Sequence, residues 1–141
     1  MLKKNVLILL MAVAVCAGTF AQKTAEDYFT SGNVHYENNN FKKAVADYTE
    51  AIRLNPNFAE AYYFRGNSYS LNDSDKAIAD YTEAIRLNHR YAEAYYNRGW
   101  SYFWIEDYDK AIADFEAALK IDPNNAYAKN ALEKAKKARE N

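Results

Sequence analysis

The sequence predicts an all-α protein built as a solenoid of antiparallel helix hairpins. The pentapeptide Ala-Glu-Ala-Tyr-Tyr occurs at residues 59–63 and again, 33 residues later, at 92–96. A ten-residue motif that begins Lys-Ala and contains Ala-Asp-Tyr or Ala-Asp-Phe occurs three times, at 43–52, 76–85 and 110–119. Self-similarity at this period is typical of stacked helical units, and apolar residues spaced by three and four within each unit indicate helices.

Length and composition exclude several other classes of protein. A chain of 141 residues allows one domain. Half of the residues are hydrophobic, two are proline, and 18 Lys and Arg face 19 Asp and Glu. This balance excludes a disordered chain, a collagen-like chain and a nucleic-acid binder that depends on charge. A single cysteine can form neither an internal disulfide nor a structural zinc site.

Residues 1–21 have the pattern of an export signal. Lys3 and Lys4 precede an apolar run over 6–15, and small residues end at Ala21. The run is shorter than the roughly 20 residues that a membrane span needs. We therefore expect cleavage after Ala21 and a mature domain of residues 22–141 in the bacterial periplasm.

An alternative interpretation of the same segment is a lipid anchor. Residues 13–16, Val-Ala-Val-Cys, resemble the box of a bacterial lipoprotein, in which Cys16 would be lipidated. Val15 departs from this pattern because the box has a small residue directly before its cysteine.

The mature domain divides into three units and a final helix. The units are residues 25–58, 59–91 and 92–125, each predicted to be a helix hairpin, and 126–139 is predicted to be a seventh helix. The middle unit is one residue shorter, and the missing residue falls in the turn before Ser74. A deletion there shortens a loop and leaves both helices intact.

Glycine, alanine and proline mark the same positions in successive units. Glycine inside a helix costs about 1 kcal/mol relative to alanine, so three glycines at one position require a packing reason. We expect a close approach of the two helices, with each glycine facing a small residue of the second helix. The glycines are Gly32, Gly66 and Gly99, the alanines are Ala44, Ala77 and Ala111, and the junction prolines are Pro56 and Pro123.

These positions resemble the tetratricopeptide repeat family over residues 25–125. In the third unit the family's seven marker positions fall on Tyr95, Gly99, Tyr102, Ala111, Phe115, Ala118 and Pro123. Ser31, Arg65 and Arg98 depart from the pattern, since the family usually has leucine there. The resemblance implies a right-handed superhelix whose first helices line a concave groove, and a final helix that covers the last hydrophobic face.

The helix predicted over 94–105 has more apolar surface than one partner helix can cover. We expect the tyrosines on the same stripe as the glycines to be core, namely Tyr62, Tyr69, Tyr95 and Tyr102. Besides Tyr95 and Tyr102, this helix has a second aromatic stripe of Tyr96, Trp100, Phe103 and Trp104. Two interpretations are open: neighbouring helices bury this stripe, or it forms the floor of the groove. By the geometry of the family, the predicted groove residues are Phe29, Asn33, Tyr36, Tyr63, Asn67, Ser70, Tyr96, Trp100, Phe103 and Trp104.

An aromatic floor edged by carboxylates favours an apolar or basic partner. Glu26, Glu60 and Glu93 share one repeat position along the predicted edge. One subgroup of the family clamps the C-terminal carboxylate of chaperone tails with lysine, arginine and asparagine. Asn33 matches one clamp position, but Glu93 stands where a cation is needed, and Phe29, Phe64 and Asn97 occupy the others. The sequence therefore argues against that function.

Chemistry-bearing residues give no sign of catalysis, a metal or a cofactor. His35 and His89 have no paired ligand spacing. Asp47, Asp80 and Asp114 share one repeat position, which indicates a solvated or ion-paired helix face. With no nucleophile beside a base and no phosphate-binding loop, we expect a non-enzymatic module that binds a peptide or protein. The alternatives are a passive lipid-anchored scaffold of the cell envelope and a binder of apolar small molecules.

Overall fold

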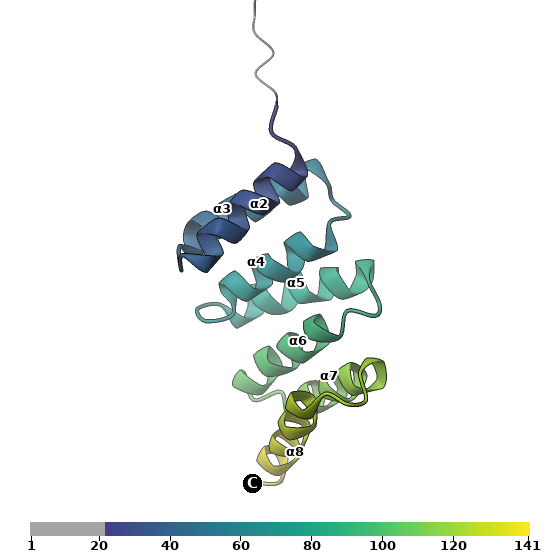
Figure 1. The fold of residues 1–141 in the computed structure, drawn as a ribbon. Coiled ribbons are helices and arrows are strands. Elements are labelled where there is room, and N and C mark those ends of the chain that lie inside the picture. Colours follow the sequence, from purple (N-terminus) through teal and green to yellow (C-terminus); the bar gives the residue numbers. More distant parts are fainter. Residues whose placement is uncertain (1–21) are drawn as a thin grey trace, which may run out of the picture.

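A computed structural model describes residues 22–141 as stacked antiparallel helix pairs followed by a single helix (Figure 1). The predicted export signal and Cys16 lie outside the described residues. The helices of this part of the chain are α2 (Ala25–Glu37), α3 (Phe41–Leu54), α4 (Ala59–Tyr69), α5 (Ser74–Leu87), α6 (Ala92–Trp104), α7 (Tyr108–Ile121) and α8 (Ala126–Glu140). The prediction of an all-α repeat solenoid is confirmed. Among the described helices, none combines the length and apolar character that crossing a membrane requires.

Local hydrogen bonds fix where several helices begin and end. Thr24 and Asp27 form a capping box at the start of α2, and Asp73 and Asp107 accept a backbone N–H at the starts of α5 and α7. The turns inside the first and third hairpins each contain one residue at positive φ, Asn39 at 58° and Glu106 at 63°. The middle hairpin has no such residue in its turn. Its first helix, α4, has 11 residues where α2 and α6 have 13 each, so the expectation that the deletion leaves both helices intact is wrong for this helix.

An aromatic ring of the second helix covers the glycine of the first helix in every pair. A methyl group at Gly32 would lie 2.6 Å from Tyr48 Cε1, far inside contact distance. The same geometry joins Gly66 to Tyr81 at 2.8 Å and Gly99 to Phe115 at 2.7 Å. The glycines are therefore required by packing, but the nearest partner is a ring and not the predicted alanine. Ala44, Ala77 and Ala111 are completely buried in the same interior.

The tyrosines predicted to be core are only half-buried. Tyr62 and Tyr95 lie under the guanidinium groups of Arg65 and Arg98, at 5.6 and 5.7 Å from ring centroid to Cζ. Tyr69 and Tyr102 are likewise half-buried, each beside a lysine. Alanines and the aromatic rings of the second helices fill the interior where these tyrosines were expected. The four tyrosines therefore lie at the edge of the interior and pack against cations.

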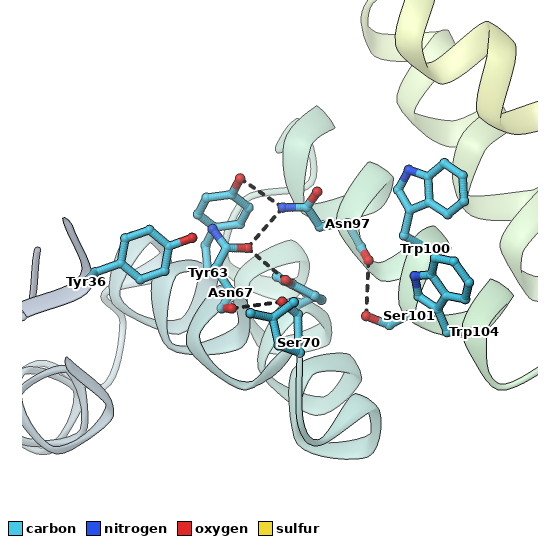
Figure 2. A pocket seen from close by; sticks show the side chains of 10 residues that line it. Tyr36, Tyr63, Asn67, Ser70, Asn97, Trp100, Ser101 and Trp104 are labelled. Atoms are coloured by element: carbon cyan, nitrogen blue, oxygen red, sulfur yellow. Dashed lines mark hydrogen bonds between the residues drawn. The ribbon is translucent and has the colours of Figure 1, made fainter. Parts of the chain in front are cut away.

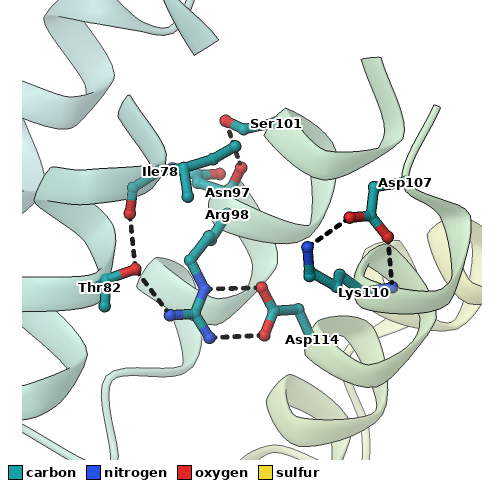
Figure 3. A network of polar contacts seen from close by, with 8 residues as sticks. All are labelled: Ile78, Thr82, Asn97, Arg98, Ser101, Asp107, Lys110 and Asp114. Atoms are coloured by element: carbon teal, nitrogen blue, oxygen red, sulfur yellow. Dashed lines mark hydrogen bonds and ion pairs between the residues drawn. The ribbon is translucent and has the colours of Figure 1, made fainter. Parts of the chain in front are cut away.

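Arginines at the family's leucine position link each pair of helices to the preceding pair. Arg98 of α6 donates two hydrogen bonds of 2.8 Å to Asp114 of α7 and one of 2.9 Å to Thr82 of α5 (Figure 3). Arg65 repeats this arrangement one unit earlier with Asp80 and Thr49. Burial raises the pKa of the Asp114 carboxyl, because desolvation outweighs its bonds to Arg98. Both arginine–aspartate pairs are thus structural.

In the first pair of helices, serine replaces this arginine. Ser31 donates a hydrogen bond of 2.6 Å to Asp47, and His35 Nε2 lies 3.8 Å from the same carboxylate. No earlier helix pair precedes α2 within the described chain, so there is no threonine for an arginine to reach. The repeated aspartates therefore hold neighbouring helices together, in agreement with an ion-paired face.

Candidate functional site

A groove of about 390 Å³ opens between the first helices of the three pairs (Figure 2). Its residues come from α2, α4 and α6, with one ring from α5 and two side chains, Ser70 and Leu71, from the turn after α4. The lining residues are Tyr36, Tyr63, Asn67, Ser70, Leu71, Tyr81, Asn97, Trp100, Ser101 and Trp104. Among residues 22–141, no charged side chain lines this groove.

Aromatic and aliphatic side chains form one end of the groove. Trp104 is 68% exposed, and Leu71, which faces the same space, is 76% exposed. The indole of Trp100 stacks on that of Trp104 with ring centroids 6.1 Å apart and an interplanar angle of 27°. Exposed apolar side chains gathered on a concave surface are typical of a binding site.

The final helix covers part of the second aromatic stripe and leaves the rest open. Trp100 is half-buried against Phe115, and Lys134 of α8 lies 5.4 Å from its ring. Phe103 also packs near Lys134. Trp104 remains exposed. Each of the two interpretations of this stripe therefore applies to part of it, with Trp104 facing solvent and Phe103 packed beneath.

Amides and hydroxyls form the floor of the groove at its centre. The Tyr81 hydroxyl donates to Asn67 Oδ1 at 2.7 Å, and Asn97 Nδ2 donates to the same oxygen at 3.0 Å. Asn97 Nδ2 also lies within hydrogen-bond distance of the Tyr63 hydroxyl, at 3.1 Å. Burial raises the pKa of Tyr63 and of Tyr81, so both phenols stay protonated at neutral pH. The floor is polar, neutral and internally hydrogen-bonded.

The ring–amide pair changes character in the third pair of helices. The Tyr48 hydroxyl donates to Asn33 at 2.8 Å in the first pair, as Tyr81 does to Asn67 in the second. In the third pair, Phe115 and Trp100 occupy these positions, with ring centroids 5.5 Å apart. The tyrosine and the asparagine are replaced together, so no hydrogen-bonding group at these two positions loses its partner. This end of the groove is therefore apolar.

Six of the ten predicted groove residues line the groove, and four lie beside it. The six are Tyr36, Tyr63, Asn67, Ser70, Trp100 and Trp104. Phe29 packs on Phe58 at 4.8 Å, and Asn33 holds the Tyr48 hydroxyl. Tyr96 packs on Phe115 at 5.9 Å, and Phe103 on Tyr108 at 5.4 Å. These four residues pack against neighbouring helices and do not line the groove, while contact of any predicted residue with a partner stays a prediction.

Sequence reasoning did not assign Leu71, Tyr81, Asn97 and Ser101 to the groove. Leu71 occupies the same repeat position as Trp104, and this shared position could have identified it. Tyr81 reaches the groove through its bond to Asn67 of the same helix pair, and Asn97 reaches Asn67 from the next pair, a contact that the sequence of one unit does not reveal. Within the described part of the chain, no group of His, Cys, Asp or Glu side chains could hold a metal ion.

Comparison with known families identifies the repeats. A model described as tetratricopeptide repeat matches residues 92–125, and one described as TPR repeat matches 32–73 and 68–104. The chain belongs to the tetratricopeptide repeat family. Comparison with curated proteins gave no match.

Solved structures of this family have the same fold. The first TPR of Spaghetti (RPAP3), bound to the HSP90 peptide SRMEEVD, has a TM-score of 0.81 and 28% identity, covering 84% of this chain and 94% of its own. The Arabidopsis OM64 TPR domain has a TM-score of 0.78 and 34% identity, covering 81% and 95%. The second TPR domain of human RPAP3, in complex with the HSP70 peptide SGPTIEEVD, has a TM-score of 0.77 and 27% identity, covering 79% and 94%.

Proposed function

We propose that the protein is a non-enzymatic interaction module that binds a peptide segment of a partner protein in the groove of α2, α4 and α6. Two similar domains are bound to peptides, which supports an interaction role for this chain. The observation that carries the proposal is the exposed pair Leu71 and Trp104 beside a neutral polar floor. Aromatic side chains of this kind supply large contact areas at small entropic cost.

The groove chemistry favours a segment with apolar residues and a neutral or basic flank. Both peptides in the similar structures end in Glu-Glu-Val-Asp and are acidic. The lining of the groove in this chain offers such a tail no cation. The Glu93 carboxylate contributes to raising the pKa of Tyr63, which places negative charge near the groove. An acidic tail would therefore be repelled at this edge and unpaired in the groove.

Intrinsic fluorescence tests the proposal directly, because the chain has only two tryptophans and both line the groove. The first probe is the acetylated, amidated peptide Lys-Leu-Phe-Leu-Lys, which contains no tryptophan and is apolar and basic. The second probe is the acidic peptide SRMEEVD. We expect the first peptide to shift the tryptophan emission to shorter wavelength and the second to leave it unchanged.

Variants distinguish groove binding from a nonspecific apolar contact. Trp104→Ala should weaken binding of the basic peptide by about tenfold or more, the size of a binding hot spot. Its melting temperature should change little, because the side chain is exposed. Tyr127→Ala is the matched control, since Tyr127 is 77% exposed on α8 and does not line the groove. Equal effects of the two variants, or a larger shift of tryptophan emission with SRMEEVD than with the basic peptide, would contradict the proposal.

We also propose that the chain is exported and that its signal is cleaved after Ala21. The support is the sequence pattern of residues 1–21. N-terminal sequencing of the protein from its own envelope fraction should begin at Gln22. Fatty-acid labelling that disappears in Cys16→Ser would favour the lipid-anchored scaffold instead.

A further inference from the structure

A second pocket lies between the α5–α6 junction and the end of α7, formed by residues that do not line the groove. Its volume is about 430 Å³, and its lining is His89, Arg90, Tyr95, Ala117, Lys120 and Ile121. Three of these residues, His89, Arg90 and Lys120, have basic side chains, and none is acidic. The repeat supplies an internal comparison, because the same positions occur in the preceding units.

At the end of α7, the third unit has lost an acidic residue that the other units keep. Glu50 pairs with Arg53 at 2.9 Å in α3, and Glu83 pairs with Arg86 at 2.9 Å in α5. The third unit has Ala117 at the glutamate position and Lys120 at the arginine position. The alanine leaves space where the glutamate would lie, and within residues 22–141 Lys120 forms no ion pair.

At the junction before α6, the chain has gained basic residues that the turn does not require. Asn88 Oδ1 accepts the backbone N–H of Arg90 at 3.0 Å. Asn55 makes the same bond to Asn57 at 3.2 Å in the first junction, where proline and asparagine stand in place of His89 and Arg90. Since both sequences form this turn, folding does not explain the basic pair. Two separate departures from the repeat thus meet in one pocket, and each makes it more positive.

We propose that this pocket binds a carboxylate-bearing segment of a partner protein, with an apolar residue beside the acidic one. Arg90 and Lys120 supply the positive charge, and guanidinium groups pair with carboxylates through two parallel hydrogen bonds. The ring of Tyr95 and the side chain of Ile121 supply an apolar wall. The pocket lies outside the groove, so a partner could contact both surfaces.

The backbone of the junction argues for a carboxylate over a phosphate. Phosphate sites commonly use several backbone N–H donors in a row. Here the N–H of Arg90 is bonded to Asn88 Oδ1, that of Tyr91 to the Asn88 carbonyl at 3.1 Å, and that of Ala92 to the Arg90 carbonyl at 3.0 Å. Binding therefore depends on the side-chain cations and the apolar wall.

Reversion to the protein's own repeat residues provides the test. The probe is the capped peptide Gly-Glu-Leu-Glu-Phe-Glu-Gly, and the neutral control has glutamine at each glutamate. Amide shifts of the isotopically labelled protein should change at 88–91 and 117–121 with the acidic peptide only. The double variant Arg90→Asn with Ala117→Glu restores residues that other units tolerate, so it should fold and should weaken binding by about tenfold.

Further experiments distinguish binding at this pocket from binding in the groove, and a carboxylate ligand from other anions. Trp104→Ala should leave binding of the acidic peptide unchanged, so this inference can fail or hold independently of the proposed groove. Raising the salt from about 50 mM to about 500 mM should weaken binding, because the cations are exposed. Unchanged affinity in the double variant would overturn the site. Displacement of the peptide by inorganic phosphate or by phosphatidylglycerol vesicles, each more effective than chloride, would overturn the carboxylate assignment.

Discussion

Replacing Arg98 with leucine, the residue that the family usually has at this position, should destabilise the protein strongly. The side chains of Arg98 and Asp114 are 16% and 8% exposed, and two hydrogen bonds of 2.8 Å join them. The leucine would leave a buried carboxylate without its partner. Removing one partner of a buried ion pair costs about 3–5 kcal/mol, and we expect a loss near the lower limit because Asp114 can take up a proton.

The stability lost in Arg98→Leu should depend on pH and should be partly restored by a second substitution, because Asp114 is buried beside Arg98. In Arg98→Leu the pKa of Asp114 should rise further, so the penalty is fully present above that pKa and decreases as the pH falls through it. Removing both charges in Arg98→Leu with Asp114→Ala should bring stability back to within about 1–2 kcal/mol of the native protein, since apolar replacement of a buried pair is often tolerated.

Urea unfolding followed by far-ultraviolet circular dichroism measures these changes. Arg53→Ala is the control, because Arg53 and Glu50 form an exposed pair, at 61% and 40%, and its loss should cost less than about 1 kcal/mol. If Arg98→Leu cost no more than Arg53→Ala, or if the double variant were less stable than Arg98→Leu, the description of this pair as a buried and mutually dependent unit would be wrong.

Two further predictions concern packing and helix capping. Gly99→Ala would place a methyl group 2.7 Å from the buried ring of Phe115, so overpacking of roughly 1–3 kcal/mol should outweigh the gain of about 1 kcal/mol in helix propensity, and the urea midpoint should fall. A midpoint that rises would show that the ring can move aside. Hydrogen bonds from Lys76 hold the pKa of Asp73 below its ordinary value, so its contribution to stability is present above that ordinary value and is lost as the pH falls through the lowered one. Asp73→Asn should therefore reduce the acid-induced loss of stability in urea titrations at several pH values, and an unchanged pH profile would contradict this.

The helix pairs were predictable because glycine, alanine and apolar residues recur at the same positions in each unit. The glycine at positions such as Gly66 indicated a close contact, and the contact is there. Its partner was misassigned because Ala77 and Tyr81 are one helical turn apart on the same face, and sequence spacing alone does not show which of them reaches the glycine. The ring reaches it, and the alanine lets the helices come close enough.

The groove was predictable only in part, because its lining depends on contacts between units. Asn97 belongs to the third unit but bonds to Asn67 of the second. Arg98 was recognisable as a departure from the family pattern, yet its role needed the position of Thr82 in the preceding unit. In each case the missing information was the angle between successive helix pairs, which arises from packing and not from the sequence of one unit.

The exchange of a tyrosine–asparagine pair for Phe115 and Trp100 makes the two ends of the groove chemically unlike. A groove with identical ends would accept a bound segment in either orientation. For the peptide proposed above, a segment with a polar half and an apolar half has one favoured orientation, with the polar half over Asn67 and Asn97 and the apolar half on Trp100 and Trp104. The opposite orientation would place polar groups against the indoles and apolar groups against the amides, so the proposed groove would select the order of polar and apolar residues along the peptide.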